Sequence, residues 1–244
     1  AILMVEFFGD SMEELTAKYT AFIASLELNK QGFAYPILYG EETKKAWDLR
    51  KAGLGLLRNL PGDTQPVNLI EDCAVAVEDL PDYIDELEVI LQRFQVQYSV
   101  YAHAGAGELH VEPMINLKEE KGRKAFREIL KQTTELVKKY KGSLSGEHGD
   151  GRLRGEFIPQ MMGQEVYTLF QETKQIFDPN GVFNRGKIVN TPPMDEFLRV
   201  DYIRKSTTLP KSVFDFTEQE SILRLAEKCS GSGDCRKTEI TGGT

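Results

Sequence analysis

The chain has 244 residues, 41% hydrophobic and 28% charged, which is long enough to bury one substantial core or two small ones. Its formal net charge of -8 argues against nucleic acid as the main partner, because phosphate binding requires a basic surface. No apolar run reaches the roughly 20 residues that span a bilayer. The three cysteines are an odd number and do not suggest a disulfide framework, so the composition indicates a reducing, cytoplasmic setting.

The N-terminal residues predict an alternation of strands and helices. The apolar run at residues 2–8 predicts a buried strand, and Ser11 with Glu14 has the capping-box spacing that opens a helix. A second strand is expected at residues 33–39 and a second helix at 41–57. Because the chain does not begin with Met and an apolar strand starts at once, we expect it to be a segment of a longer protein.

The rest of the chain predicts a mixed fold. A strand is expected at residues 73–77, a hairpin at 97–102 and 109–114, and helices at 81–94, 117–140 and 164–177. Such a mixture predicts an α+β fold with a largely antiparallel sheet covered by helices. Breakers near residue 191 suggest a first domain over 1–190 and, over 191–244, a linker with a short helix at 217–229.

All three histidines lie in two glycine-rich segments. His103 and His110 flank the turn of the predicted hairpin, where facing side chains are about 5 Å apart. Glu147 and His148 follow in the second segment. Two imidazoles and a carboxylate suit zinc, manganese or iron and leave positions open for substrate, with His148 as a candidate general base. The alternative is that His103 and His110 are hydrogen-bonded turn residues.

Other side chains offer less specific signals. Arginine can bind a carboxylate through two parallel hydrogen bonds, and the candidates, each also compatible with an ordinary surface charge, are Arg50, Arg152 and Arg154. Cys229 and Cys235 could ligate an iron-sulfur cluster, which needs further thiolates. Cys73 lies in an apolar stretch and is expected in the core.

Five motifs occur in an order that resembles a known family. They are Trp47–Arg50, Glu71–Val75 with Leu80–Ile84, His103–His110, Gly146–Gly151 and Phe177–Lys187. Over residues 1–190 they resemble the ferredoxin-like C-terminal cap domain of FAD-linked 2-hydroxyacid oxidases and dehydrogenases. This family includes the relatives of glycolate oxidase, D-lactate dehydrogenase and D-2-hydroxyglutarate dehydrogenase, and it belongs to the vanillyl-alcohol oxidase type of flavoproteins. Residues 226–237 resemble the junction to an iron-sulfur domain in fused relatives.

The resemblance implies roles for individual residues. A divalent metal is expected on His103, His110 and Glu147, and His148 is expected to be the base beside the flavin. Arg50 would hold the substrate carboxylate, and the further cofactor residues would be Asn184 near the flavin ring and, for a 4Fe-4S cluster, Cys229 and Cys235. The chain departs from many relatives at Ala106–Glu108, where they have Asp-Gly-Asn, and at Arg185, where they have Pro.

The implied reaction is oxidation of a 2-hydroxy acid by hydride transfer to FAD, which a domain upstream of this chain would mainly bind. Electrons would pass through iron-sulfur centres to an acceptor in the cytoplasm or at the membrane periphery, and a homodimer is compatible with this. The segment alone is expected to be inactive. Two other classes fit the same residues: a metal-dependent hydrolase that activates water, and a non-catalytic binding module.

Overall fold

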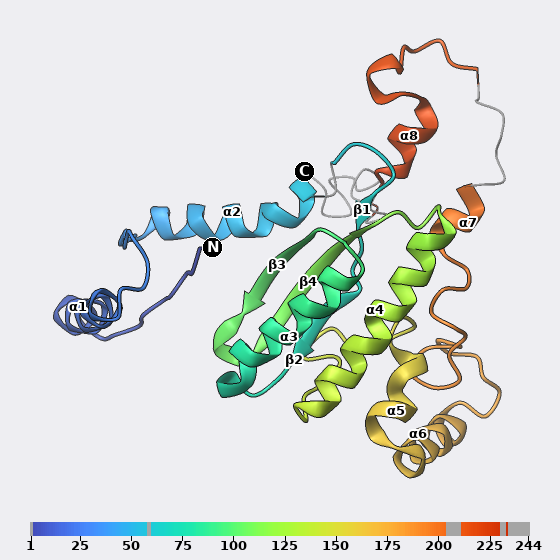
Figure 1. Ribbon diagram of the computed structural model, residues 1–244, viewed down its shortest axis with the longest axis horizontal. Helices are drawn as coiled ribbons and strands as arrows, with labels where there is room; N and C mark the ends of the chain where they lie inside the picture. The colour runs from blue at the N-terminus through green and yellow to red at the C-terminus, as the bar shows by residue number, and fades with distance from the viewer. Residues whose placement is uncertain (1, 58–59, 204–210, 230–232, 234–244) are drawn as a thin grey trace, which may run out of the picture. The chain divides into compact units, whose positions relative to one another are not determined.

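The computed structural model describes residues 2–57, 60–203, 211–229 and 233 (Figure 1). The chain divides into two compact units, Ala1–Gly53 and Leu54–Thr244. None of the described helices is both long and apolar enough to cross a membrane.

The N-terminal unit contains helix α1 (Met12–Leu28) and most of helix α2 (Glu41–Leu57). Helix α1 begins as predicted: the Ser11 hydroxyl accepts a hydrogen bond from the Glu14 N–H at 3.2 Å, and the Glu14 carboxylate accepts one from the Asp10 N–H at 2.9 Å. The strands predicted at residues 2–8 and 33–39 are wrong, since neither segment is in a strand. A strand requires a hydrogen-bonded neighbour, and the described residues of this unit contain no strand to pair with.

The second unit contains a four-stranded antiparallel sheet built around one strand. Strand β4 (Glu108–Ile115) pairs with β3 (Tyr98–His103) in the predicted hairpin. Its two ends also pair with β1 (Gln65–Pro66) and β2 (Ile70–Ala74), again antiparallel. Strand β2 lies three residues earlier than the strand predicted at 73–77, because residues 77–79 form a 3-10 turn instead.

Helices α3 (Leu80–Arg93) and α4 (Glu120–Lys139) pack side by side across the sheet and confirm the α+β class (Figure 1). The core between them takes side chains at alternating positions of β4 and at helical spacing in α4. Each such side chain stabilises the fold by roughly 1.5–3 kcal/mol through its burial. The fully or almost fully buried members include Leu69, Ile70, Leu87, Leu91, Leu109, Val111, Ile129, Leu130 and Val137.

A smaller cluster follows, formed by α5 (Ile158–Met162) and α6 (Gln164–Phe177), where Ile158, Tyr167 and Val189 are buried. The chain then returns to the main core, into which Met194 is buried. Helix α7 (Arg199–Ile203) comes next. Contacts group all of residues 54–244 in one unit, and the domain boundary expected near residue 190 stays a prediction.

The last described helix, α8 (Ile222–Glu227), is shorter than predicted. Thr217–Gln219 form a 3-10 turn, Glu220 then has a φ of +66°, and Ser221 caps the helix by accepting a hydrogen bond from the Arg224 N–H at 3.2 Å. The predicted helix start at Thr217 is therefore wrong. Left-handed backbone at Glu220 interrupts the helix, and Ser221 supplies the cap one turn later.

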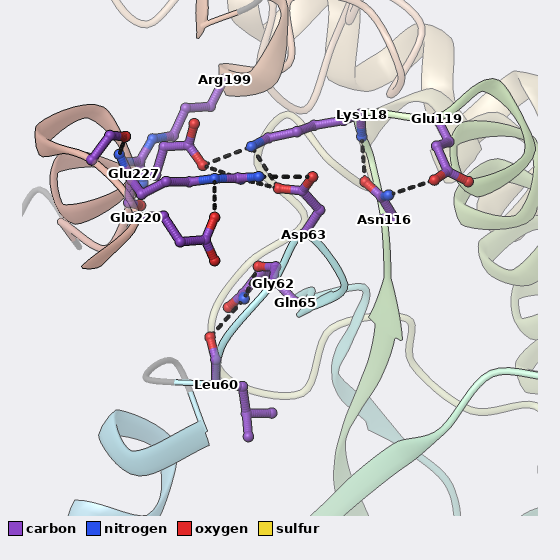
Figure 2. A network of polar contacts seen from close by, with 12 residues as sticks. Leu60, Gly62, Asp63, Gln65, Asn116, Lys118, Glu119, Arg199, Glu220 and Glu227 are labelled. Atoms are coloured by element: carbon purple, nitrogen blue, oxygen red, sulfur yellow. Dashed lines mark hydrogen bonds and ion pairs between the residues drawn. The ribbon is translucent and has the colours of Figure 1, made fainter. Parts of the chain in front are cut away.

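Polar contacts attach α8 to the loop before β1 and to the start of the β4–α4 connection (Figure 2). Arg224 binds Asp63 through Nη1 and Nη2, and Lys118 Nζ lies 2.7 Å from both Asp63 Oδ1 and Glu227 Oε2. The hydrogen bonds from Arg224 and then Lys118 lower the pKa of Asp63 to about 2. The helix is thus held mainly by charged side chains.

Candidate functional site

The β3–β4 hairpin brings His103 and His110 together diagonally. His110 lies opposite Tyr101, and His103 lies opposite Glu108, so the prediction that the two histidines face each other directly is wrong. Both histidines are nevertheless on the same face, because His103 is two residues from Tyr101. Their rings are 5.3 Å apart between centroids, within the reach expected of diagonal neighbours.

The turn of this hairpin is fixed against the end of β2. Gly107 has a φ of +72°, and a Cβ added there would lie 2.0 Å from the carbonyl oxygen of Val75. The Val75 N–H donates to the Gly107 carbonyl at 3.0 Å. Only glycine fits this close approach, which holds the two histidines in register.

The second glycine-rich segment reaches the histidines because it begins along the other edge of β2. Ala74 and Ser143 exchange backbone hydrogen bonds of 3.0 and 2.8 Å, and the Gly146 N–H donates to the Asp72 carbonyl at 2.7 Å. The chain then turns, with a φ of +81° at Gly149. The segment therefore turns away from β2 and places Glu147 and His148 beside the hairpin.

The Glu147 carboxylate lies among the three imidazoles. Its Oε1 is 3.1 Å from Nε2 of His148, 3.8 Å from Nε2 of His110 and 4.0 Å from Nε2 of His103. The rings of His110 and His148 stack at 5.5 Å. The structure thus brings together all four residues that the sequence placed at the site.

The donor set of His103, His110 and Glu147 fits a divalent cation, because their ligand atoms all lie within 4.8 Å of one another. His110 Nδ1 contacts the backbone carbonyl oxygen of Glu71, which requires a proton on Nδ1 and leaves Nε2 as the ligating atom. The His110 side chain is 12% exposed, whereas those of His103 and Glu147 are 46% and 49% exposed. One side of the group is therefore open to a small molecule.

Glu71 forms a second, overlapping group with His110 and His148, again within 4.8 Å. Its Oε1 lies 3.6 Å from His148 Nδ1. Sequence reasoning assigned Glu71 no role, because it precedes the strand predicted at residues 73–77 and only the fold brings it to the histidines.

Sequence reasoning also missed Asp72 and misjudged Arg154. Arg154 is 4% exposed and forms an ion pair with the fully buried Asp72, so its candidacy for a substrate carboxylate is wrong. Burial raises the pKa of Asp72, but the hydrogen bonds from the His148 N–H and the Ser145 hydroxyl, with the charge of Arg154, outweigh it and lower that pKa overall.

The remaining predicted residues lie elsewhere. Arg152 donates to the Glu196 carbonyl at 3.0 Å and lies over the Phe197 ring. Arg50 is on α2, and its Nη2 is buried without a hydrogen-bond partner among the described residues. Asn184 is exposed, with a φ of +42°, and its Oδ1 accepts a hydrogen bond from Lys187 at 3.0 Å.

Only one of the two cysteines predicted to bind an iron-sulfur cluster lies among the described residues. Cys229 is exposed at the end of α8, and its carbonyl accepts a hydrogen bond from Arg199 at 2.8 Å. Cys235 lies outside the described residues. Among the described residues, neither of the two groups that could hold a metal ion includes a cysteine.

Comparison with known proteins gives the class of this chain. Residues 1–188 match the family of FAD linked oxidases, C-terminal domain, and the chain belongs to this family. It is 34% identical to D-2-hydroxyglutarate dehydrogenase of Pseudomonas putida over 238 residues, which cover 96% of this chain and 23% of that protein. The corresponding enzyme of Escherichia coli is 31% identical over 241 residues, with 95% and 23% covered.

A more distant relative is the glycolate oxidase subunit GlcD of Bacillus subtilis, at 25% identity over 166 residues, which cover 65% of this chain and 34% of that protein. The chain spans about a quarter (23%) of the length of the dehydrogenases it matches. The resemblance inferred from the five motifs is confirmed.

Proposed function

We propose that this chain is the substrate-covering part of an FAD-dependent dehydrogenase of a 2-hydroxy acid, of the D-2-hydroxyglutarate, D-lactate or glycolate type. The observation that carries the proposal is the group of His103, His110 and Glu147, whose donor atoms lie within 4.8 Å of one another. Two neutral imidazoles and one carboxylate suit Zn²⁺, Mn²⁺ or Fe²⁺ and leave coordination positions for a substrate. Family membership favours this reading over a metal-dependent hydrolase or a binding module.

Individual residues of this chain would have different roles in the reaction. When bound, the cation would make the substrate hydroxyl more acidic and FAD would accept the hydride from the α-carbon. The imidazole of His148 is suited to accept the hydroxyl proton, because its side chain is 43% exposed and the Glu147 carboxylate 3.1 Å away would stabilise the imidazolium that forms. Asn184 offers an exposed amide that fits a polar, flat ligand such as the flavin ring.

Arg50 is the residue proposed to bind the substrate carboxylate. The support is the resemblance and the buried Nη2 that has no partner among the described residues, since a buried donor nitrogen without a partner gains most from an anionic ligand.

The base assignment is tested by His148→Ala in the complete protein. A general base contributes typically about 10²–10⁴-fold to the rate, so anaerobic flavin reduction by the preferred 2-hydroxy acid should slow by about that factor. D-2-hydroxyglutarate, D-lactate and glycolate would each be tried, with metal content measured in parallel. Wild-type reduction rates in the variant, at unchanged metal content, would refute the role of His148.

We also propose that electrons leave through a 4Fe-4S centre to which Cys229 and Cys235 contribute. The support is the likeness of residues 226–237 to the junction in fused relatives and the exposure of Cys229. Iron and acid-labile sulfide in the complete protein should fall in Cys229→Ser. The electron acceptor, a cytoplasmic location and a homodimer stay predictions.

A further inference from the structure

A single buried carboxylate lies beneath the segment that carries Glu147 and His148. We propose that Asp72, held by Arg154, is the positioning residue that fixes the backbone from which these two side chains project. The inference rests on the proposed function, because it assigns Asp72 to the same site without any contact with metal or substrate.

Three donors converge on one oxygen of Asp72. Its Oδ2 accepts hydrogen bonds from the N–H groups of Glu147 at 3.1 Å and His148 at 2.6 Å, and from the Ser145 hydroxyl at 2.7 Å. Two consecutive N–H groups can share one acceptor only when the peptide between them is turned toward it. The two contacts therefore set the directions in which the side chains of Glu147 and His148 leave the backbone.

The remaining contacts close the segment around the same carboxylate. The Ser145 hydroxyl accepts a hydrogen bond from the Gly149 N–H at 2.7 Å, and Arg154 Nη2 donates to the Gly149 carbonyl at 2.6 Å. Arg154 Nη1 binds the other oxygen of Asp72. Residues 145–154 are thus tied to β2 through Asp72 at both ends of the turn.

The chemistry of these contacts requires a carboxylate. Every group that faces the Asp72 side chain in this network is a donor, so all of them are satisfied by an acceptor that bears a negative charge. An asparagine would turn its NH₂ group toward either the backbone N–H groups or Arg154. Asp72→Asn should therefore disturb the orientation of residues 145–154, although it hardly changes the volume of the side chain.

The test measures Zn²⁺ and Mn²⁺ affinity by calorimetry in wild type, Asp72→Asn, Ser145→Ala and Ser145→Thr. Partners that orient ligands typically account for about 10–100-fold in metal affinity. We expect Asp72→Asn to weaken binding at least tenfold and Ser145→Ala severalfold, with Ser145→Thr close to wild type because it keeps the hydroxyl. Leu130→Ala, in the fully buried core of α4, is the control. It should lower the melting temperature and leave the affinity within about twofold of wild type.

A second measurement needs no metal. Hydrogen exchange at the Glu147 and His148 amides should accelerate at least tenfold in Asp72→Asn, while the amide of Val111 in β4 keeps its protection. Unchanged exchange at both amides, or unchanged metal affinity in a folded Asp72→Asn, would overturn the role of Asp72. If Asp72→Asn does not fold, equal metal affinity in Ser145→Ala and wild type would overturn it. Failure of the wild type to bind either metal would instead refute the proposed metal site, and exchange would then decide separately whether Asp72 anchors the segment.

Discussion

Burial separates the two cysteines that the structure describes. Cys73 is fully buried in β2, and this burial, against an opposing effect of the Arg154 charge, raises the pKa of its thiol to about 12. Cys229 is exposed. Because the thiolate is the reactive form, we expect iodoacetamide at pH 8 to modify Cys229 and spare Cys73, as read by mass spectrometry of the peptides.

Unfolding in guanidinium is the control for this experiment, since both thiols should then react. Equal rates of Cys73 modification in the native and the unfolded protein would contradict the burial of this thiol.

Single residues were predictable where their chemistry is rare and local. Three histidines that all lie in two glycine-rich segments of a 244-residue chain indicated the candidate site directly. Asp72 and Arg154 gave no such signal, because 82 positions separate them and their ion pair exists only once β2 and the second glycine-rich segment lie together. An ion pair between distant residues is a property of the fold and has no sequence pattern of its own.

The hairpin depends on Gly107 more than on its other glycine, Gly105. Gly107→Ala would combine a left-handed φ of +72° with a Cβ placed 2.0 Å from the Val75 carbonyl. We expect a loss of about 2 kcal/mol or more in the free energy of unfolding, measured in urea. The matched control is Gly105→Ala in the same turn, where an added Cβ meets nothing within 4 Å and should change stability by less than about 1 kcal/mol. Equal effects of the two changes would argue against this turn geometry.

Helix α8 depends on Asp63. The pKa of this carboxyl falls from its ordinary 3.8 to about 2, mainly through Arg224, so the stabilisation is fully present above pH 4 and is lost as the pH falls through 2. With a side chain 31% exposed, the contact is worth no more than about 1–2 kcal/mol.

Asp63→Asn should therefore lower the hydrogen-exchange protection of the α8 amides about tenfold at pH 6, and the difference from wild type should narrow between pH 4 and 2. Asp215→Asn is the matched control, because within the described part of the chain the hydrogen bonds to the Asp215 carboxylate come from Thr217, two residues away. A constant difference across this pH range would exclude Asp63 as the group responsible.

Helices were predicted more reliably than strands for a physical reason. The helices found at Leu80–Arg93, Glu120–Lys139 and Gln164–Phe177 each satisfy their own backbone hydrogen bonds, so period and end residues suffice to find them. The apolar runs at residues 2–8 and 33–39 have a composition that suits strands, but strand formation needs a partner that composition does not specify.

For the whole chain, the location of the core makes a prediction about truncation. All buried hydrophobic residues among those described lie between Leu69 and Met194, and the N-terminal unit contributes none. Residues 54–244 should therefore fold cooperatively without residues 1–53, with a urea midpoint near that of the whole chain and the same Zn²⁺ affinity. Circular dichroism in urea would show this, and a broad, non-cooperative transition would contradict it.

His110 belongs to both groups of potential ligands, one with His103 and Glu147 and the other with Glu71 and His148. Its Nδ1 is engaged by the Glu71 carbonyl, which leaves a single nitrogen to coordinate. Because both groups share this nitrogen, they would hold one cation between them at a time. The proposed site should therefore bind one ion per chain at saturation, and a cation held by Glu71 and His148 would occupy the imidazole that we propose as the base.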